Sequence, residues 1–260
     1  MTNNIFASGL RFERGSELLD WRIDTLREKE PETLAWLETL RVKSAPALID
    51  IGANIGIYSL YAAAAMQEHD GAVLAVEPQY ANYRVLLSNI RLNPHLRVFP
   101  LHAGVNSVPG LTGLTVKDAR PGASGGQVAN SSDQEALRGT SANGDAAEMD
   151  DGIEGSEIEL ISTFTLDYLG SMLTSTNIYI KIDVDGLEAS ILKSGEKLLA
   201  DERTLSVLVE FNHPDEEHFW SQELAACGLR RDYTFESLAG HSSTRRQRTG
   251  QPARNVIFSR

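Results

Sequence analysis

The stretch that most constrains the fold runs from Ala47 to Ala65 and reads ALIDIGANIGIYSLYAAAA. It opens with an apolar run typical of a buried strand, passes through a turn with Gly52 and Gly56, and continues as an alanine-rich segment with helical periodicity. This order is typical of nucleotide-type sites, because the glycines let the backbone approach a ligand and the helix N-terminus presents free N–H groups. We therefore predict a cofactor at this turn.

The spacing and charge of the turn argue against a dinucleotide. A dinucleotide fingerprint needs G-x-G-x-x-G, with the pyrophosphate at the start of the helix, and the order Gly52, Asn54, Gly56 lacks that spacing. Asp50, near the end of the strand, would also place a carboxylate where a diphosphate must lie. A cationic ligand fits this turn better.

A second acidic residue indicates which cationic ligand. The next predicted strand, Ala72–Val76, is followed by Glu77 and Pro78, and a carboxylate at this position can accept hydrogen bonds from both ribose hydroxyls. Two acids and a glycine turn together describe S-adenosylmethionine, although the glycines could instead only cap an ordinary strand-to-helix turn. The residues predicted to bind this cofactor are Asp50, Gly52, Ala53, Asn54, Gly56, Ile57, Glu77, Pro78 and Asp183.

Five stretches, in order, resemble the FkbM family of S-adenosylmethionine-dependent methyltransferases. They read DIGANIGIYSL, VEPQYANYRVLLSNIRLN, STFTLDYL, IYIKIDVDGLEASILKSGEKLL and VLVEFNH, and they extend from about Glu30 to Glu210. The resemblance implies a class I, Rossmann-like α/β fold with a doubly wound, mostly parallel seven-stranded sheet. This chain departs from the family pattern at Asp185, where a glutamate is usual, and at Leu187, where an alanine is usual.

The bulk composition is that of one globular protein. The length of 260 residues suits a single large α/β domain, which we divide into an N-terminal helical segment, 1–45, split by Pro31 into two helices, and a methyltransferase domain, 46–260. A net charge of −12 argues against a nucleic-acid partner. The single cysteine, Cys227, excludes an intrachain disulfide. We expect a cytoplasmic protein, because we find neither a signal peptide nor a run of roughly 18 apolar residues.

Two polar tracts interrupt the predicted strands. Residues 118–157 hold nine acidic residues and two arginines, and we interpret them as a flexible, partly disordered insertion without a substrate-facing role, placed between paired strands at Gly113–Val116 and Ile158–Ile161. The arginine-rich tract Thr244–Arg254 is expected to be a hairpin loop between strands at Leu229–Phe235 and Asn255–Ser259.

The catalytic candidates follow the later strands. A hydroxyl acceptor needs help from a general base, and the carboxyl ends of strands Ile178–Ile182 and Val207–Phe211 would lie beside the first motif in a doubly wound sheet. Our candidates there are Lys181, Asp183, Glu210 and His213, with Asp185 as a further possible base. We interpret Thr165 or Asp167 as the cap of the helix that follows them, a structural role.

The sequence thus predicts an S-adenosylmethionine-dependent enzyme that O-methylates a sugar or a secondary metabolite, with a small molecule or glycan as its acceptor. One alternative uses magnesium, held by Asp183, Asp185 and Glu210, to polarise the acceptor. The others are a non-catalytic module that binds S-adenosylmethionine and an NAD-dependent oxidoreductase. We predict no resident metal, and the acceptor, the pathway and the oligomeric state stay open.

Overall fold

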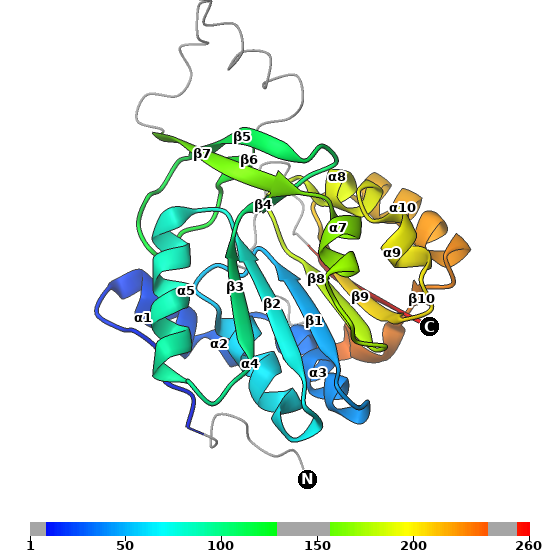
Figure 1. Cartoon of the computed structure of the whole chain (residues 1–260), viewed down its shortest axis with the longest axis horizontal. Coiled ribbons are helices and arrows are strands. Elements are labelled where there is room, and N and C mark those ends of the chain that lie inside the picture. The colour runs from blue at the N-terminus through cyan, green and yellow to red at the C-terminus, as the bar shows by residue number, and fades with distance from the viewer. Residues whose placement is uncertain (1–8, 129–156, 239–253) are drawn as a thin grey trace, which may run out of the picture.

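The computed structural model of the chain describes residues 9–128, 157–238 and 254–260. In this part of the chain, a seven-stranded sheet lies between two layers of helices (Figure 1), and its strand order is β10-β11-β9-β8-β1-β2-β3. The strands are β1 (Ala47–Ile51), β2 (Ala72–Glu77), β3 (Val98–His102), β8 (Ile178–Ile182), β9 (Thr204–Phe211), β10 (Arg230–Arg231) and β11 (Arg254–Ser259).

The pairing confirms the predicted doubly wound, mostly parallel sheet. Strands β3, β2, β1, β8 and β9 pair in parallel, whereas β11 pairs antiparallel with both β9 and β10. The chain leaves the sheet after β3 and returns at β8 on the other side of β1. The boundary between β1 and β8 is therefore the point where the winding reverses, and ligands of such sheets bind at the carboxyl ends of the strands there.

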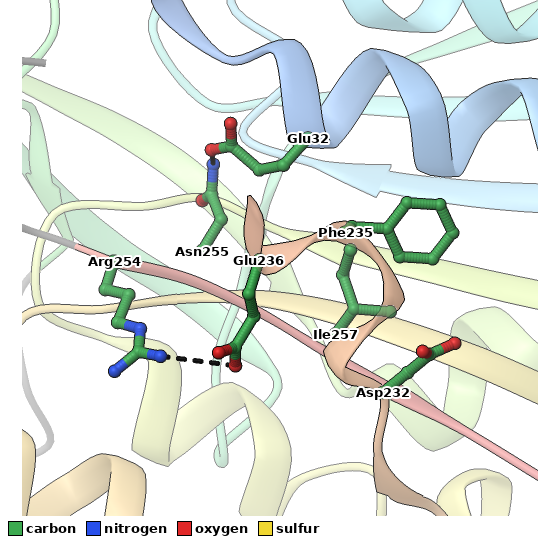
Figure 2. Close-up of a pocket in the computed structure, with 7 residues that line it drawn as sticks. All are labelled: Glu32, Asp232, Phe235, Glu236, Arg254, Asn255 and Ile257. Carbon is green, nitrogen blue, oxygen red and sulfur yellow. Dashed lines mark hydrogen bonds and ion pairs between the residues drawn. The ribbon is translucent and has the colours of Figure 1, made fainter. Parts of the chain in front are cut away.

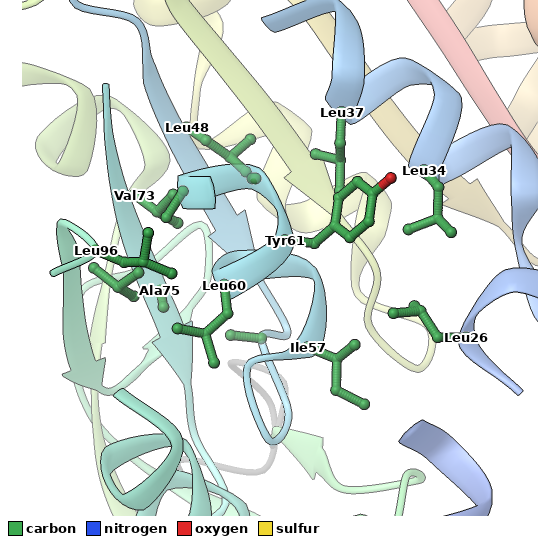
Figure 3. Close-up of a cluster of buried hydrophobic side chains, with 14 of the residues drawn as sticks. Leu26, Leu34, Leu37, Leu48, Ile57, Leu60, Tyr61, Val73, Ala75 and Leu96 are labelled. Carbon is green, nitrogen blue, oxygen red and sulfur yellow. The ribbon is translucent and has the colours of Figure 1, made fainter. Parts of the chain in front are cut away.

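Each face of the sheet has its own hydrophobic cluster, because successive side chains of a strand point to opposite faces. Leu48 belongs to the cluster shown in Figure 3, and its neighbour Ile49 belongs to the other cluster. The first cluster includes residues of α4 (Ile57–Met66), which precedes η3 (Gln67–His69), and of α5 (Tyr80–Leu92). The second includes residues of α7 (Leu166–Ser171), α8 (Glu188–Lys193), α9 (Glu196–Ala200) and α10 (Pro214–Ala226).

The N-terminal segment is helical, as predicted, and packs onto the first cluster. The expected first helix is divided at Thr25 into α1 (Glu17–Asp24) and α2 (Leu26–Lys29), while Pro31 begins α3 (Pro31–Thr39), which continues into η2 (Leu40–Val42). Leu26 and Leu37 are buried in the same cluster as Leu48 of β1. The segment therefore shares a core with the sheet.

A second, smaller sheet follows β3. It contains β4 (Gly104–Val105), β5 (Gly110–Val116), β6 (Gln127–Val128) and β7 (Glu157–Phe164) in the order β4-β7-β5-β6. The predicted pairing of strands on either side of the acidic tract is confirmed, because β5 and β7 pair antiparallel. Residues 129–156, most of the tract that we interpreted as a flexible insertion, lie outside the described residues.

The strand predicted at Leu229–Phe235 is wrong in extent. Only Arg230–Arg231 pairs with β11, and the chain then turns into the short helix η4 (Tyr233–Leu238). The side chain of Asp232 accepts a hydrogen bond from the N–H of Thr234 at 2.9 Å, a local turn that competes with strand pairing. The predicted hairpin loop lies outside the described residues except for Arg254.

We predict that Trp36 contributes strongly to the stability of the fold. Its side chain is 1% exposed, and its Nε1–H donates to Ser206 Oγ of β9 at 3.0 Å. The substitution W36A should lower the free energy of unfolding by about 3–5 kcal/mol, measured by urea denaturation. The control W21A removes a side chain that is 42% exposed and should cost less than about 1 kcal/mol. Equal losses in the two variants would contradict the packing of α3 on the sheet.

Candidate functional site

The turn after β1 has the backbone that its glycines predicted. Gly52 and Gly56 have φ values of +80° and +83°, a left-handed region that glycine adopts without strain. A Cβ atom on Gly52 would meet the carbonyl group of Asp183, and one on Gly56 would meet the side chain of Leu86. The packing of this turn against β8 and α5 therefore requires both glycines, whatever the turn binds.

An ion pair joins β1 to β8 directly beneath this turn. Asp50 and Lys181 are cross-strand partners, both are 0% exposed, and Lys181 Nζ lies 3.3 Å from Asp50 Oδ1. Asp50 Oδ2 also accepts a hydrogen bond from Ser59 Oγ at 2.6 Å. The predicted cofactor residue Asp50 is thus buried under the turn, and its charge is matched by a lysine.

Lys181 extends the ion pair to the edge of the sheet. Its Nζ donates to Asp183 Oδ2 at 3.0 Å, and the side chain of Asp183 is 22% exposed. Burial alone would lower the pKa of Lys181, but the charges of Asp183, Asp50 and Glu30 outweigh it and raise that pKa above its usual value. The structure therefore brings together Asp50, Lys181 and Asp183, with Asp183 as the accessible member.

Glu77 lies beside the same turn, at the end of β2. Its Oε2 accepts from the N–H of Asn54 at 2.7 Å, and its Oε1 accepts from the N–H of Gln79 at 3.0 Å and from Asn82 Nδ2 at 3.4 Å. The side chain is almost fully buried, and burial raises the pKa of Glu77 to about 7, in spite of these hydrogen bonds. Since a carboxylate offers about four acceptor sites, at least one is left for a ligand.

A narrow, mainly apolar slot opens at the switch point, and it is lined by Val76 and Pro78, the residues before and after Glu77 in the chain. Its volume is about 40 Å³, close to the space of one water molecule. The residues that line it are Ile51, Gly52, Val76, Pro78, Ala103, Gly104, Val105, Gly126, Val128, Val184, Asp185, Leu187 and Ile191. The apolar walls suit a flat ring such as a nucleobase, but the slot must widen to admit one.

Residues 118–126, which we call the covering segment, lie across this edge of the sheet. The carbonyl of Ala123 accepts hydrogen bonds from Asn54 Nδ2 at 2.8 Å and Asn82 Nδ2 at 3.0 Å, and the N–H of Gly125 donates to Asp185 Oδ2 at 2.5 Å. The sequence predicted no role at the site for this segment. Its glycine-rich composition was a signal in the sequence, but composition does not indicate a contact.

The remaining predicted residues are divided between the site and its surroundings. Pro78 lines the slot, whereas Ala53 and Ile57 are buried, Ala53 donating its N–H to the carbonyl of Val76 at 3.0 Å. Glu210 is buried one strand beyond Lys181. His213, in contrast, is exposed at the start of α10 and does not lie with the buried cluster.

The TLD stretch has two different structural roles. Thr165 caps α7, as predicted, because its side chain accepts from the N–H of Tyr168 at 3.1 Å. Asp167 instead accepts from the N–H of Leu198 in α9 at 2.8 Å. It therefore ties α7 to the neighbouring helix, so of the two predicted alternatives Thr165 is the cap.

Glu188 is a buried carboxylate near this edge that was not among the predicted site residues. It is 1% exposed, Asn212 Nδ2 donates to its Oε1 at 3.0 Å, and the N–H of Gly186 donates to the same oxygen at 3.3 Å. Burial raises the pKa of Glu188 to about 8. The signal available in the sequence was its place in the stretch DVDGLE, and its hydrogen bonds join the loop after β8 to the end of β9.

Metal-binding groups and membrane-spanning helices are both absent from the part of the chain that the structure describes. The described residues contain no group of three or more histidine, cysteine, aspartate or glutamate side chains that could hold a metal ion. In the same part of the chain, no helix is long and apolar enough to span a membrane.

Comparison with known proteins decides the family. Residues 50–236 match the sequence model of the methyltransferase FkbM domain, which is most of the chain and includes the turn, Glu77 and the β8 edge. The chain belongs to the FkbM methyltransferase family. The resemblance of the five ordered stretches is thereby confirmed, and so is the interpretation of the chain as a methyltransferase. No match was found among well-characterised proteins.

Solved structures similar to this FkbM-family chain are distant in sequence. An FkbM methyltransferase from Methylobacillus flagellatus is 12% identical, with a TM-score of 0.49 over 93% of this chain and 61% of that one. A precorrin-6y C5,15-methyltransferase from Geobacter metallireducens is 11% identical, with a TM-score of 0.44 over 96% and 94% of the two chains. This chain thus spans less than two thirds of the first protein's length, and the family assignment depends on the sequence match.

We predict that Asp50 and Lys181 are energetically coupled. The substitution K181M should lower the free energy of unfolding by about 3–5 kcal/mol, because it leaves Asp50 buried without its cation. The free energy of unfolding of the double variant D50N/K181M should fall by clearly less than the sum of the decreases in the single variants D50N and K181M. Urea denaturation measures all three values. Additive losses would contradict a direct interaction.

Glu188 should make stability depend on pH. Its pKa is raised to about 8 from an ordinary value near 4.5, so the unfolded chain releases the proton first and stability falls as pH rises from about 5 to 8. The stability of the variant E188Q should not fall in this way. Between pH 5 and 8, its free energy of unfolding should therefore rise relative to that of the natural protein by on the order of 2–3 kcal/mol, as measured by urea denaturation at several pH values. The control E196Q, at an exposed position, should follow the natural protein, and parallel curves for all three proteins would contradict the assignment.

Proposed function

We propose that this chain is an S-adenosylmethionine-dependent O-methyltransferase that acts on a hydroxyl group of a sugar or secondary metabolite. The observation that carries the proposal is the position of Glu77, which ends β2 beside the glycine turn and lies between Val76 and Pro78, two residues that line an apolar slot at the switch point of the sheet. The ribose hydroxyls of S-adenosylmethionine need a carboxylate as hydrogen-bond acceptor, and its adenine ring needs an apolar slot. The acceptor class comes from the family resemblance.

The proposed cofactor site uses four parts of the chain. The adenine would enter the slot between Pro78, Val105 and Leu187, and the ribose hydroxyls would donate to Glu77. Asp183 would accept from the amino group of the methionine part, because it is the accessible carboxylate of the buried cluster. Gly126 forms one wall of the slot, so binding requires a shift of the covering segment.

When bound, S-adenosylmethionine supplies an electrophilic methyl group, which the acceptor oxygen attacks in line while the carbon–sulfur bond breaks and its electron pair stays on sulfur. The chain must then place the acceptor and accept its proton. Asp183 and Glu210 are the carboxylates at the correct edge. Lys181 keeps its positive charge through Asp50 and Asp183, so it can stabilise the ionised form of a neighbouring base.

We predict that E77Q weakens binding of S-adenosylhomocysteine roughly tenfold or more, because a hydrogen bond to a charged group contributes about 1.5–3 kcal/mol. Isothermal titration calorimetry of the full chain measures it, and circular dichroism checks the fold. The control E68Q changes an exposed glutamate of η3 and should bind normally. Unchanged binding of S-adenosylhomocysteine by E77Q would contradict the assignment of Glu77 to the cofactor site.

The activity itself is tested with S-adenosylmethionine labelled in its methyl group, added with the chain to fractionated extract of the source organism. The proposal predicts a labelled product whose methyl group is on oxygen, formed equally well with EDTA present. Binding without transfer to any fraction would favour the non-catalytic module instead. Binding of NAD without binding of S-adenosylhomocysteine would contradict the proposed function.

A further inference from the structure

The N-terminal helix α1 contacts the covering segment through one cation, Arg22. Leu19 and Ile23 of this helix are buried in the first hydrophobic cluster, and Arg22, between them in the sequence, is half-buried. Its Nε–H donates to the carbonyl of Gly122. A Cβ atom on Gly122 would lie 3.2 Å from Leu19 Cδ2 and 3.6 Å from Arg22 Cδ. The covering segment therefore packs directly on a helix that the core holds in place.

The hydrogen-bond partner of Arg22 differs from those of several other arginines. Figure 2 shows a more usual pairing, in which Arg254 lies 3.2 Å from Glu236, and carboxylates also match Arg203 and Arg231. Arg22 donates to a neutral carbonyl, and no carboxylate of a described residue forms an ion pair with it. A guanidinium presents a planar fork of donors that fits a carboxylate. Arg22 thus has donors left for an acidic group.

The charge of Arg22 acts on the proposed cofactor site. Burial raises the pKa of Glu77 to about 7 and also raises the pKa of Asp185, and in both cases the charge of Arg22 opposes the increase. Lys181 is already matched by two carboxylates. Lys117 also acts on Asp185, but less than Arg22 does, and its side chain is exposed. Arg22 is therefore the cation best placed to receive a negative group of a ligand.

Two neighbouring carbonyl groups of the covering segment accept the donors around this site. The carbonyl of Gly122 accepts from Arg22, and that of Ala123 accepts from Asn54 Nδ2 at 2.8 Å and Asn82 Nδ2 at 3.0 Å. A carboxylate also offers two acceptor oxygens. S-adenosylmethionine carries one carboxylate, in its methionine part, and the contacts proposed above give that group no partner.

We propose that Arg22 and Asn54 bind the methionine carboxylate of S-adenosylmethionine. The carbonyls of Gly122 and Ala123 accept the same hydrogen bonds until the cofactor arrives, and its carboxylate then replaces them as the covering segment shifts. The replacement favours the ligand, because an ionised acceptor forms stronger hydrogen bonds than a neutral carbonyl. The inference depends on the cofactor proposed above, and Arg22 precedes the residues that match the family model, 50–236.

Two ligands that differ only in the carboxylate test the role of Arg22. S-adenosylhomocysteine and its decarboxylated analogue, which keeps the ammonium group, are titrated by calorimetry into the full chain. The natural protein should prefer S-adenosylhomocysteine roughly tenfold or more, the effect of one hydrogen bond between charged groups. The variant R22M should lose this preference, by weaker binding of S-adenosylhomocysteine and unchanged binding of the analogue. Circular dichroism checks its fold.

The control variant K117M removes the exposed cation that also acts on Asp185. It should bind both ligands as the natural protein does. A loss of the preference in K117M but not in R22M would assign the carboxylate to Lys117 and overturn the inference.

Hydrogen exchange followed by mass spectrometry tests the covering segment without a substitution. The N–H groups of Gly122 and Gly125 donate to Asn82 Oδ1 at 2.7 Å and to Asp185 Oδ2 at 2.5 Å. If the cofactor replaces the segment, the peptide that contains both glycines should exchange faster with S-adenosylhomocysteine present. Slower or unchanged exchange would contradict the replacement.

The remaining outcomes separate this inference from the proposed function. Equal affinity of the natural protein for the two ligands, normal binding of S-adenosylhomocysteine by R22M, or equal losses by R22M for both ligands would each overturn the role of Arg22. In each of these cases S-adenosylhomocysteine still binds, so the proposed function stands. If the natural protein does not bind S-adenosylhomocysteine, the proposed function fails, and the assignment of Arg22 fails with it.

Discussion

The buried ion pair between Asp50 and Lys181 is the interaction on which the site depends. Each ion costs several kcal/mol to remove from water, and only close pairing offsets that cost. The parallel register that sets Asp50 opposite Lys181 makes the pairing possible, because a shift of one residue would turn each charge toward the opposite, apolar face of the sheet. The pair thus fixes how β1 and β8 meet at the switch point.

The rest of the site follows from this junction. Gly52 lies against the backbone of Asp183, so the turn after β1 and the loop after β8 are held together above the ion pair. Lys181 in turn holds Asp183 at the edge, where it is partly exposed. The neighbouring strands β2 and β9 contribute Glu77 on one side and Glu210 on the other. The result is an edge at which several carboxylates surround Lys181.

Much of this was predictable from residue patterns. The turn around Gly52, the strand Ile178–Ile182 and the cap at Thr165 each depend on neighbours in sequence, which periodicity and capping rules describe. Lys181 could be recognised as exceptional because it interrupts an apolar strand. The main buried partner of Lys181 could not be recognised from the sequence. Asp50 lies opposite Lys181 only once the strand order and register are known.

Features made by distant segments were beyond sequence reasoning. The covering segment has no periodicity, and its contacts with Asn54, Asn82 and Asp185 depend on how the two sheets meet. Helix η4 replaced a predicted strand because Asp232 stabilises a local turn. The hydrogen bond from Asn255 to Glu32 joins two residues that lie 223 positions apart in the chain.

The most direct test of a sulfonium nucleoside site at this edge is a crystal structure of the chain with S-adenosylhomocysteine. The account predicts the adenine between Pro78, Val105 and Leu187, the ribose hydroxyls within about 3 Å of the Glu77 carboxylate, and the covering segment shifted from its contact with Asn54. A nucleoside bound elsewhere on the chain, or at this edge without contact to Glu77, would contradict it.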